Sequence, residues 1–555
     1  MQWLENITRP EIWKMAGYSS ARSEMSDTDG MIQLDANENP YEPYPLNHGS
    51  ANRYPDPQPK KLTSRLAAIY SVQPNQILVT RGMDEVIDLL VRVFCVPYQD
   101  SIVITPPTFG FYKVAADIAV THVVSIELEA KNDFELDVDK LITTCVNSNK
   151  IKIIFLCTPN NPTGNIIDLG KIEKIAKFLP NTIIAVDEAY IEFADTPSAV
   201  DLLDQYPNLL VMRTLSKAYA AAGVRIGTLI AHPEIIKLVA KVLPPYPLPL
   251  PSIKAALDIL SPFGLELAHR RIELLKQERK RMYLALVKLN PAIHVYKSAA
   301  NFLLLKVDDA KAIYKKFLAH GIIIRDRSKD IVNTIRISVG TPHENNLVLK
   351  ALGVKLDDTD VLKFSNRHAL VVRKTNETEI MAQVDLDQTS PIKITTGIGF
   401  FDHMLEQLAR HGGFSLQVSA NGDTHIDYHH TVEDVAIVLG QALCQALGEK
   451  RGINRYGFVV PMDEALAEAS IDLSGRGVLV MDAKFPTPMI GDFPVEMVQH
   501  FFLTFATHLK AAIHLKVTGE NSHHMVEGLF KACAKALNQA ITINSDRIPS
   551  TKGVL

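Results

Sequence analysis

Residues 151–190 are IKIIFLCTPNNPTGNIIDLGKIEKIAKFLPNTIIAVDEAY. Two short apolar runs, 151–156 and 182–186, flank residues 169–178, whose apolar positions recur at helical spacing. Each apolar run is followed by polar residues, NNPTG after the first and DEAY after the second. Alternation of strands and helices at this rhythm predicts an α/β fold, with a mostly parallel sheet and helices on both faces.

The same alternation extends outward on both sides of this stretch. Further strands are predicted over residues 77–80, 101–105, 123–128, 209–213 and 227–231, and a helix over 83–94. The proline-rich segment PPYPLP at 244–249 precedes a long charged helix, predicted over 252–289. Strands near 302–306 and 334–338 would then form a smaller lobe.

A different pattern follows the polar, acidic stretch 353–364. Strands near 369–374 and 380–385 open it, and helices and strands alternate afterwards. We therefore predict a first domain over 1–357, a short linker over 358–364, and a second, α+β domain over 365–555. Because the linker lacks Gly and Ser, we expect the two domains to be held close.

Composition and charge exclude several classes of protein. Lys and Arg total 58 against 62 Asp and Glu, for a net charge of −4, so a dedicated nucleic-acid binder is not expected. The five cysteines form no CxxC pair, and the first 30 residues contain no apolar core of a secretory signal. No run of 18 apolar residues occurs. We expect a soluble cytoplasmic protein that does not bind membranes.

Polar side chains in the first domain follow three predicted strands. Asn161, Asp187 and Lys217 each lie just past a strand, where the ends of parallel strands converge on one crevice. An amine, a carboxylate and an amide meeting there are typical of pyridoxal phosphate sites, which hold the cofactor through a lysine and place an acid on its ring nitrogen. Taken singly, each residue is an ordinary surface charge, cap or turn; their joint order favours the cofactor.

The remaining cofactor contacts follow from this placement. Asp187 would keep the ring nitrogen protonated, and Asn161 and Tyr190 would hydrogen-bond the ring oxygen. The phosphate would meet these groups: Ser216, Arg225 and the amides of Gly82 and Met83 at a helix start.

Histidines mark the second domain, since ten of the 18 lie between His403 and His524. Two modules recur there, each a histidine followed by HHxxE: 403 with 429–433, and 500 with 523–527. Such repetition predicts two similar halves packed face to face. On a helix, adjacent histidines point about 100° apart and therefore bind different ions. The eight candidate ligands, enough for two sites of four, are His403, His429, His430, Glu433, His500, His523, His524 and Glu527. Imidazole and carboxylate without cysteine favour Mn, Fe, Co or Zn.

The first domain resembles the histidinol-phosphate aminotransferases, which are fold-type I enzymes that use pyridoxal phosphate. The resemblance rests on YSSAR (18–22), LDANE (34–38), RYPD (53–56), TRGMDE (80–85) and PYP (245–247), together with the strand-end residues. It implies a dimer in which Tyr54 reaches the neighbouring cofactor phosphate, and substrate contacts from Tyr18, Arg325 and Arg336, the last with the glutamate carboxylate or the substrate phosphate. Phe109 takes a ring-stacking position that is often Tyr, and Met83 replaces a smaller residue.

The second domain resembles the imidazoleglycerol-phosphate dehydratases across residues 365–555. Matching stretches are RKTNET (373–378), GFFDHML (399–405), HHTVED (429–434), GINRYG (452–457), DLSGR (472–476), NSHHMVE (521–527) and PSTKG (549–553). The resemblance implies two Mn²⁺ ions per site, a large oligomer with sites at subunit interfaces, and phosphate contacts from Arg455, Arg476, Ser550 and Lys552. Glu377 is our candidate acid/base. Departures from the family pattern are Tyr428, Met489, Gln499 and Thr551.

Together the resemblances imply a bifunctional enzyme of histidine biosynthesis that acts on small phosphate esters and glutamate. It would dehydrate imidazoleglycerol phosphate to imidazoleacetol phosphate and transaminate that ketone to L-histidinol phosphate. Two alternatives remain at this point. One half could be a non-catalytic assembly module, or the chain could pair a transaminase with a metal-dependent phosphatase. DLDQT at 385–389 imitates a phosphatase signature, although it falls inside the dehydratase-like domain.

Overall fold

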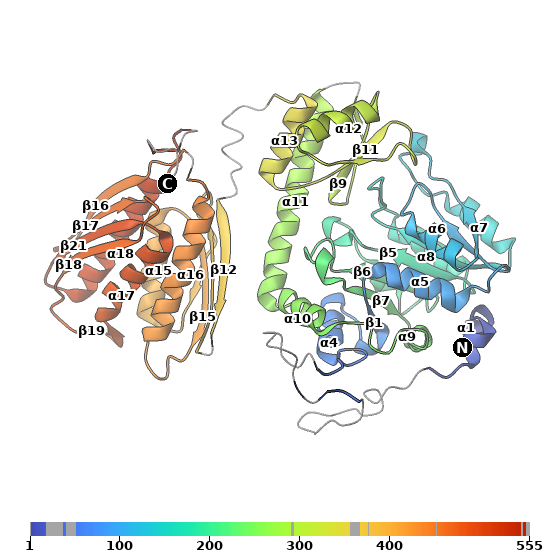
Figure 1. The fold of residues 1–555 in the computed structure, drawn as a ribbon, viewed down its shortest axis with the longest axis horizontal. Coiled ribbons are helices and arrows are strands. Elements are labelled where there is room, and N and C mark those ends of the chain that lie inside the picture. Colours follow the sequence, from blue (N-terminus) through green and yellow to red (C-terminus); the bar gives the residue numbers. More distant parts are fainter. Residues whose placement is uncertain are drawn as a thin grey trace. The chain divides into compact units, whose positions relative to one another are not determined.

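The computed structural model describes residues 2–17, 37–39, 41, 52–289, 293–355, 367–375, 377–450, 452–545 and 548–550. The predictions that lie outside these residues concern Tyr18, Thr551, Lys552 and the linker 358–364. The chain divides into two compact units, Met1–Asp357 and Asp358–Leu555 (Figure 1). Each unit is described by itself.

Within the described residues, the first unit contains a seven-stranded sheet in the order β1-β7-β6-β5-β4-β2-β3. The strands are β1 (Ile77–Thr80), β2 (Ser101–Ile104), β3 (His122–Ser125), β4 (Ile151–Cys157), β5 (Ile183–Asp187), β6 (Leu209–Thr214) and β7 (Gly227–Ala231). Neighbours from β3 to β6 are parallel, and β7 is antiparallel to both β6 and β1. The predicted mostly parallel sheet is confirmed.

Some helices of this unit precede β1 and others follow strands of the sheet. They are α1 (Gln2–Ile7), α2 (Pro10–Lys14), α4 (Lys60–Tyr70), α5 (Met83–Phe94), α6 (Phe111–Ile118), α7 (Val138–Val146), α8 (Leu169–Phe178) and α9 (Pro233–Ala240). The helices predicted over 83–94 and 169–178 are confirmed. Short 3₁₀ turns are η1 (Pro74–Gln76), η2 (Ala130–Asn132), η3 (Ile191–Phe193), η4 (Ala199–Leu202) and η5 (Ala222–Val224). Every residue of β1, β2, β5, β6 and β7 is buried, as strands covered on both faces require.

The prediction of one long helix over residues 252–289 is wrong. The structure has two helices there, α10 (Leu250–Ile259) and α11 (Pro262–Leu289). Pro262 lacks an amide hydrogen and disfavours helical conformation in the residue before it, so the first helix ends and a new one begins. Gly264 fits this turn because a Cβ there would lie 2.2 Å from the Ile259 carbonyl oxygen.

A smaller lobe completes the first unit. Its four described strands are β8 (His294–Val295), β9 (Phe302–Lys306), β10 (Arg325–Asp326) and β11 (Thr334–Ser338), all antiparallel, in the order β10-β11-β9-β8. Helices α12 (Ala310–Ala319) and α13 (Pro342–Leu352) belong to this lobe. Buried side chains from its strands and helices form a separate hydrophobic cluster with the end of α11.

The second unit contains two four-stranded sheets of the same design among its described residues. Their orders are β12-β13-β15-β14 and β16-β17-β21-β18, and in each the last pair is parallel and the others antiparallel. The strands are β12 (His368–Lys374), β13 (Thr378–Asp385), β14 (Ile392–Thr395), β15 (Ser415–Gly422), β16 (Tyr456–Met462), β17 (Ala465–Asp472), β18 (Val478–Ala483) and β21 (Ala512–Thr518). A small ribbon pairs β19 (Met489–Ile490) with β20 (Phe493–Pro494).

Among the residues described for this unit, four helices lie between the sheets (Figure 1). They are α15 (Gly399–Gly412), α16 (His429–Leu447), α17 (Glu496–Leu509) and α18 (Ser522–Ile541). Helix α16 packs on β12 and β13 and against α17, while α18 packs on β16 and β17 and against α15. Each half thus repeats the same order of strands and helices, as the repeated histidine modules predict.

The described helices include none that has both the length and the apolar character to cross a membrane.

Candidate active sites

The first candidate site lies where the three neighbouring strands β4, β5 and β6 end. A cavity of about 280 Å³ opens there. Its lining includes nine predicted residues: Met83, Phe109, Asn161, Asp187, Tyr190, Ser216, Lys217, Arg225 and Arg336. The topology brings these side chains together because parallel strands place their carboxyl ends at one edge of the sheet.

Lys217 extends into this cavity from the turn after β6. Its Nζ lies 5.9 Å from the centroid of the Tyr190 ring. Burial of the Lys217 amine, and then the positive charge of Arg336, lower the pKa of Lys217 below its ordinary value. A lysine with a lowered pKa is more often neutral, and a neutral amine is the form that attacks a carbonyl group.

Asp187 is the last residue of β5 and is only 1% exposed. Burial raises the pKa of its carboxyl to about 6, although two hydrogen bonds oppose the shift. The Tyr112 hydroxyl donates to Oδ2, and the Ala189 amide donates to Oδ1 at 3.0 Å. The carboxylate is therefore fixed in position at the cavity wall.

Several of the predicted phosphate-binding groups lie at the first turn of α5. Gly82, the residue before that helix, has φ +93°, and a Cβ there would lie 2.5 Å from Nη2 of Arg225. Arg225 also lies 3.6 Å from Asp84 of the same turn. Ser216 lines the same cavity, and its hydroxyl accepts a hydrogen bond from that of Thr214 at 3.0 Å. A guanidinium, a hydroxyl and a helix amino end together are suited to bind an anion.

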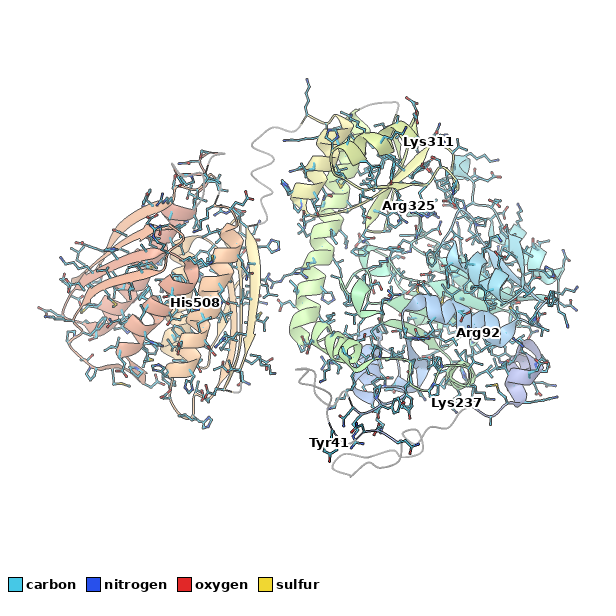
Figure 2. All side chains as sticks on the ribbon, in the orientation of Figure 1. Tyr41, Arg92, Lys237, Lys311, Arg325 and His508 are labelled. Atoms are coloured by element: carbon cyan, nitrogen blue, oxygen red, sulfur yellow. The ribbon has the colours of Figure 1, made fainter. Side chains whose placement is uncertain are left out.

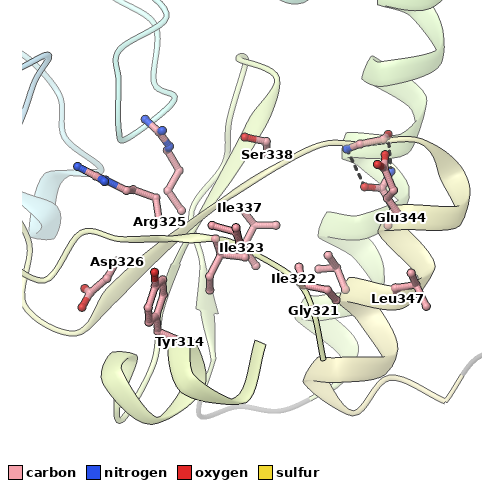
Figure 3. Close-up of a pocket in the computed structure, with 15 residues that line it drawn as sticks. Tyr314, Gly321, Ile322, Ile323, Arg325, Asp326, Ile337, Ser338, Glu344 and Leu347 are labelled. Carbon is pink, nitrogen blue, oxygen red and sulfur yellow. Dashed lines mark hydrogen bonds between the residues drawn. The ribbon is translucent and has the colours of Figure 1, made fainter. Parts of the chain in front are cut away.

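The two arginines predicted to bind substrate are cross-strand partners in the small lobe. Arg336 donates a hydrogen bond to Asn161 and lies over the Phe302 ring at 5.1 Å. Arg325 pairs with Arg336 in the β10–β11 register and is exposed (Figure 2). Both line a larger cavity of about 720 Å³ on the small lobe, whose other walls include Tyr314, Ile323 and Leu347 (Figure 3). Arg336 thus borders both cavities.

Tyr54 does not line the cofactor cavity of its own chain. Its ring stacks on Tyr246 with centroids 4.4 Å apart, and the residue is 51% exposed. That position leaves it available to another copy of the chain.

Two residues of this site were missed by the sequence analysis. Cys157, at the end of β4, lines the cavity, and Tyr112 contacts Asp187. Tyr112 follows the ring-stacking candidate Phe109 by one helical turn, but only the fold brings it to a carboxylate 75 residues away.

The second candidate site consists of histidine–carboxylate clusters in the second unit. One ligand atom each from His429, Glu433 and His500 lie within 4.8 Å of one another. Nε2 of His500 is 3.5 Å from Glu433 and is buried without a hydrogen-bond partner. An unpaired buried nitrogen facing a carboxylate is suited to a metal ion.

A matching cluster contains His403, His523 and Glu527. Nε2 of His403 and of His523 lie 3.8 and 3.6 Å from the Glu527 carboxylate. Lys531, which the sequence analysis missed, donates to the same carboxylate at 2.8 Å from one turn further along α18. Each cluster joins the two halves, since His500 meets the first HHxxE and His403 meets the second.

The remaining candidate ligands face other carboxylates. Nδ1 of His430 lies 3.0 Å from Asp423 and 3.6 Å from Glu377, the candidate acid/base. Nδ1 of His524 lies 2.8 Å from Glu464. Within the described residues of one chain, His429, Glu433 and His500 form one group of three candidate ligands, and His403 and His523 each lie near Glu527.

The predicted phosphate contacts of this unit are only partly assembled. Arg455 makes a two-pronged ion pair with Asp472, at 2.6 and 3.0 Å, and Arg476 is exposed. Ser550 follows Pro549, whose carbonyl accepts from Arg455 at 3.1 Å. Among the unusual residues, Tyr428 donates to Asp492 at 2.8 Å, Met489 and Gln499 are exposed, and Thr551 lies outside the described residues.

The phosphatase-like segment DLDQT has a structural setting of its own. Its first residue, Asp385, ends β13, and Asp387 pairs with Arg367 at 3.1 Å. β13 is a central strand of the first four-stranded sheet in this unit, between β12 and β15. The described residues of the second unit form no doubly wound parallel sheet around the segment, so the phosphatase reading gains no support.

Two family models match the chain. Residues 29–352, more than half of it, match "Aminotransferase class I and II", and residues 396–537 match "Imidazoleglycerol-phosphate dehydratase". The histidinol-phosphate aminotransferase of Xanthomonas axonopodis pv. citri (strain 306) is 44% identical over 355 residues, which are 62% of this chain and 96% of that protein. That of Xylella fastidiosa (strain Temecula1 / ATCC 700964) is 41% identical over 351 residues, which are 62% of this chain and 95% of that protein.

Solved structures support the fold of the first unit. The histidinol-phosphate aminotransferase from Sinorhizobium meliloti, in complex with pyridoxal-5'-phosphate, has a TM-score of 0.50 and 23% identity, covering 59% of this chain and 89% of that one. The enzyme from Clostridium acetobutylicum has a TM-score of 0.50 and 24% identity, covering 55% and 90%. The chain belongs to the class I and II aminotransferases, with histidinol-phosphate aminotransferases as its curated relatives, and its added imidazoleglycerol-phosphate dehydratase domain makes it a bifunctional enzyme of histidine biosynthesis.

Proposed function

We propose that the second unit dehydrates imidazoleglycerol phosphate to imidazoleacetol phosphate and that the first unit transaminates this ketone, with glutamate as donor, to L-histidinol phosphate. The observation that carries the proposal is the presence of both family domains, supported by the lining of the first cavity and by the group of His429, Glu433 and His500 in the second unit. The two reactions are consecutive, since loss of water leaves an enol that becomes the ketone, and a ketone is what a transaminase consumes.

The first site fits pyridoxal phosphate. Lys217, Asp187 and the ring of Phe109 line one cavity. Arg225 lies so close to Gly82 that a Cβ on Gly82 would clash with its guanidinium. When bound, the cofactor supplies an electron sink for removal of the proton next to the amine. Lys217 would hold the cofactor and move that proton, Asp187 would hold the ring-nitrogen proton, and Tyr190 would donate to the ring oxygen.

Substrate anions would be bound by the small lobe. Arg336 lies in hydrogen-bond contact with Asn161 and borders the cofactor cavity, so its guanidinium can bind the glutamate carboxylate or the substrate phosphate. Arg325 is beside it in the sheet register, and Tyr54 and Tyr18 would complete the site, with Tyr54 acting on the neighbouring subunit.

We propose that the second site binds two divalent ions, which are Mn²⁺. Its donors are imidazole nitrogen and carboxylate oxygen without cysteine, and His500 offers a buried nitrogen that has no other partner. When bound, the ions would make the substrate imidazole more acidic and help release the hydroxyl. Glu377 lies near His430 and would carry the proton from carbon; Arg455, Arg476, Ser550 and Lys552 would bind the phosphate.

His430 and His524 support assembly into a larger oligomer. A histidine that ligates a metal usually gives its other ring nitrogen to a carboxylate, and both residues place Nδ1 on one, Asp423 and Glu464. Their Nε2 atoms are then free to complete the three-ligand clusters of another copy. We propose sites at subunit interfaces for this reason, besides an aminotransferase dimer.

We also propose a cytoplasmic location, which suits five described cysteines that are all free thiols.

Separate assays of the two half-reactions test the proposal. With Mn²⁺ and imidazoleglycerol phosphate alone, the chain should form imidazoleacetol phosphate and release no inorganic phosphate. With pyridoxal phosphate, histidinol phosphate and 2-oxoglutarate, it should form glutamate. Phosphate release from histidinol phosphate would favour the phosphatase alternative, and inactivity of one half with full activity of the other would favour an assembly module.

A further inference from the structure

The Asp187 carboxylate has a hydroxyl partner that the proposed reaction does not use. Tyr112 lies in the first turn of α6, and its hydroxyl donates to Oδ2 of Asp187. Oδ1 accepts from the Ala189 amide at 3.0 Å. Tyr112 and Asp187 are 0% and 1% exposed, so water does not compete for this contact.

Aromatic packing holds the Tyr112 ring in place. It stacks on Phe155 of β4, with centroids 4.8 Å apart and planes within 7°. Its edge meets Phe109, the ring-stacking candidate, at 5.6 Å and 86°. Packing on two sides restricts rotation of the ring, so the hydroxyl remains directed at the carboxylate.

The hydroxyl is a permanent donor. Burial, and then the charge of Asp187, raise the pKa of Tyr112 well above its ordinary value, so the phenol keeps its proton. Asp187 itself is made more basic by burial, and the bond from Tyr112 opposes that effect. Loss of the bond would therefore increase the basicity of the carboxylate.

The basicity of Asp187 decides where a shared proton resides. A pyridine nitrogen and a buried carboxylate are bases of similar strength, so one proton between them can lie on either. The electron sink works best when the proton is on the ring. A hydrogen bond to a charged group in a protein interior is strong enough to shift this balance by about one to two pH units.

We propose that Tyr112 is a positioning residue that holds the Asp187 carboxylate in orientation and keeps the shared proton on the cofactor ring nitrogen. This inference rests on the proposed pyridoxal phosphate site, and it adds to it a residue three positions from Phe109. Tyr112 does not touch the cavity itself; it acts through Asp187.

The test is Tyr112→Phe in the full chain loaded with ¹⁵N-labelled pyridoxal phosphate. The variant keeps both ring contacts and loses only the hydroxyl. The ¹⁵N chemical shift of the ring nitrogen should move toward the unprotonated value, and turnover should fall about tenfold while KM changes little. Tyr206→Phe is the matched control, since it removes a hydroxyl that donates to Glu173 at 2.9 Å on another part of the unit.

The outcomes separate this inference from the cofactor proposal. If the wild-type chain shows no lysine-bound cofactor, the proposed function of the first unit fails. If it does, and the ¹⁵N shift in Tyr112→Phe equals that of wild type, Tyr112 has only a packing role and the inference is overturned. The inference would also be overturned if the ¹⁵N chemical shift changed by the same amount in Tyr206→Phe as in Tyr112→Phe.

A second substitution covers the case in which Tyr112→Phe does not fold. Tyr112→3-fluorotyrosine preserves the ring and makes the hydroxyl a stronger donor. The ¹⁵N signal should then move further toward the protonated value, and movement in the opposite direction would contradict the inference.

Discussion

Neighbouring histidines in the second unit face different partners, although they are adjacent in the chain. His429 joins Glu433 and His500, while His430 turns to Asp423. Their ring planes are 86° apart, and those of His523 and His524 are 89° apart. Helical geometry alone predicts this divergence. It would allow one short motif to contribute to two separate metal sites, as we propose.

At the scale of single residues, we expect His500→Ala, His430→Ala and His524→Ala each to weaken metal binding and abolish dehydration. Removal of a ligand loses its coordination energy, and neighbouring groups cannot replace a missing nitrogen. Metal analysis of the purified variants should find fewer than two ions per chain, with transamination unchanged.

His508→Ala is the matched control for these variants. His508 lies on the same helix as His500, but its Nδ1 contacts the Thr504 carbonyl at 2.9 Å, outside both clusters (Figure 2). It should keep two ions and full dehydration. Two tightly bound ions in His500→Ala would refute the ligand assignment.

Asp187 gives a prediction for stability and pH. Its carboxyl pKa is about 6 in the folded chain, against 3.8 for an aspartate in water, because burial disfavours the charge. The folded state therefore binds more protons between these values, and stability is lost as pH rises through 6. Without cofactor, Asp187→Asn avoids this cost. We expect the free energy of unfolding of the variant to exceed that of wild type by about 2–3 kcal/mol at pH 8.

Urea titrations of the cofactor-free chains at pH 4 and pH 8 check this expectation. The advantage of Asp187→Asn should shrink toward pH 4, where both side chains are neutral. A variant that is less stable than wild type at pH 8 would show that burial of the charge carries no such cost.

At the scale of elements, most strands of the first sheet were predictable because their apolar runs are short and bounded by turns. β1 and β7 of that sheet, and β9 and β11 of the small lobe, have the predicted ends. The break between α10 and α11 was not predicted, although Pro262 is its visible cause. Charged residues and helical apolar spacing continue on both sides of Pro262. This continuous pattern favours a single helix, so the break at the proline was not predicted.

Side-chain partners between elements were harder to predict than the elements. The spacing of the modules indicates metal ligands, but nothing local pairs His500 with Glu433 or His403 with Glu527. Those contacts depend on how α17 packs on α16 and α15 on α18. The Tyr112–Asp187 bond is likewise made by β5 and α6, which are far apart in sequence.

The approach of β7 to α5 gives a prediction at this scale. A Cβ on Gly227 would lie 2.3 Å from the Gly82 carbonyl carbon and 2.5 Å from the Met83 amide. Since both are backbone atoms, Gly227→Ala must displace the first turn of α5. We expect the free energy of unfolding to fall by about 1–3 kcal/mol and cofactor affinity to fall with it. Thermal unfolding and a cofactor titration measure both.

Gly223→Ala is the control for this change, because no atom lies within 4 Å of its Cβ position. It should differ from wild type by about 0.5 kcal/mol or less. Equal cofactor affinity in Gly227→Ala and wild type would show that the first turn of α5 does not bind the phosphate.

At the scale of the whole molecule, each unit has its own sheets and its own hydrophobic cores. We therefore predict that the units are independent catalysts. A protease site placed within residues 358–364 should, after cleavage, leave two active pieces and little change in coupled flux at saturating enzyme, because a small phosphate ester diffuses away quickly. Rates before and after cleavage measure this. A long lag that appears only after cleavage, or an inactive piece, would show dependence between the units.

The most direct test of the central claim is a coupled conversion by the single purified chain. Imidazoleglycerol phosphate, glutamate, pyridoxal phosphate and Mn²⁺ are supplied, and histidinol phosphate and 2-oxoglutarate are measured. We predict equal amounts of both products from wild type. Lys217→Ala should lose the absorbance of the lysine-bound cofactor and stop at the ketone, His500→Ala should form neither product, and a mixture of the two variants should restore the sequence. No histidinol phosphate from wild type, or its formation by Lys217→Ala alone, would contradict the account.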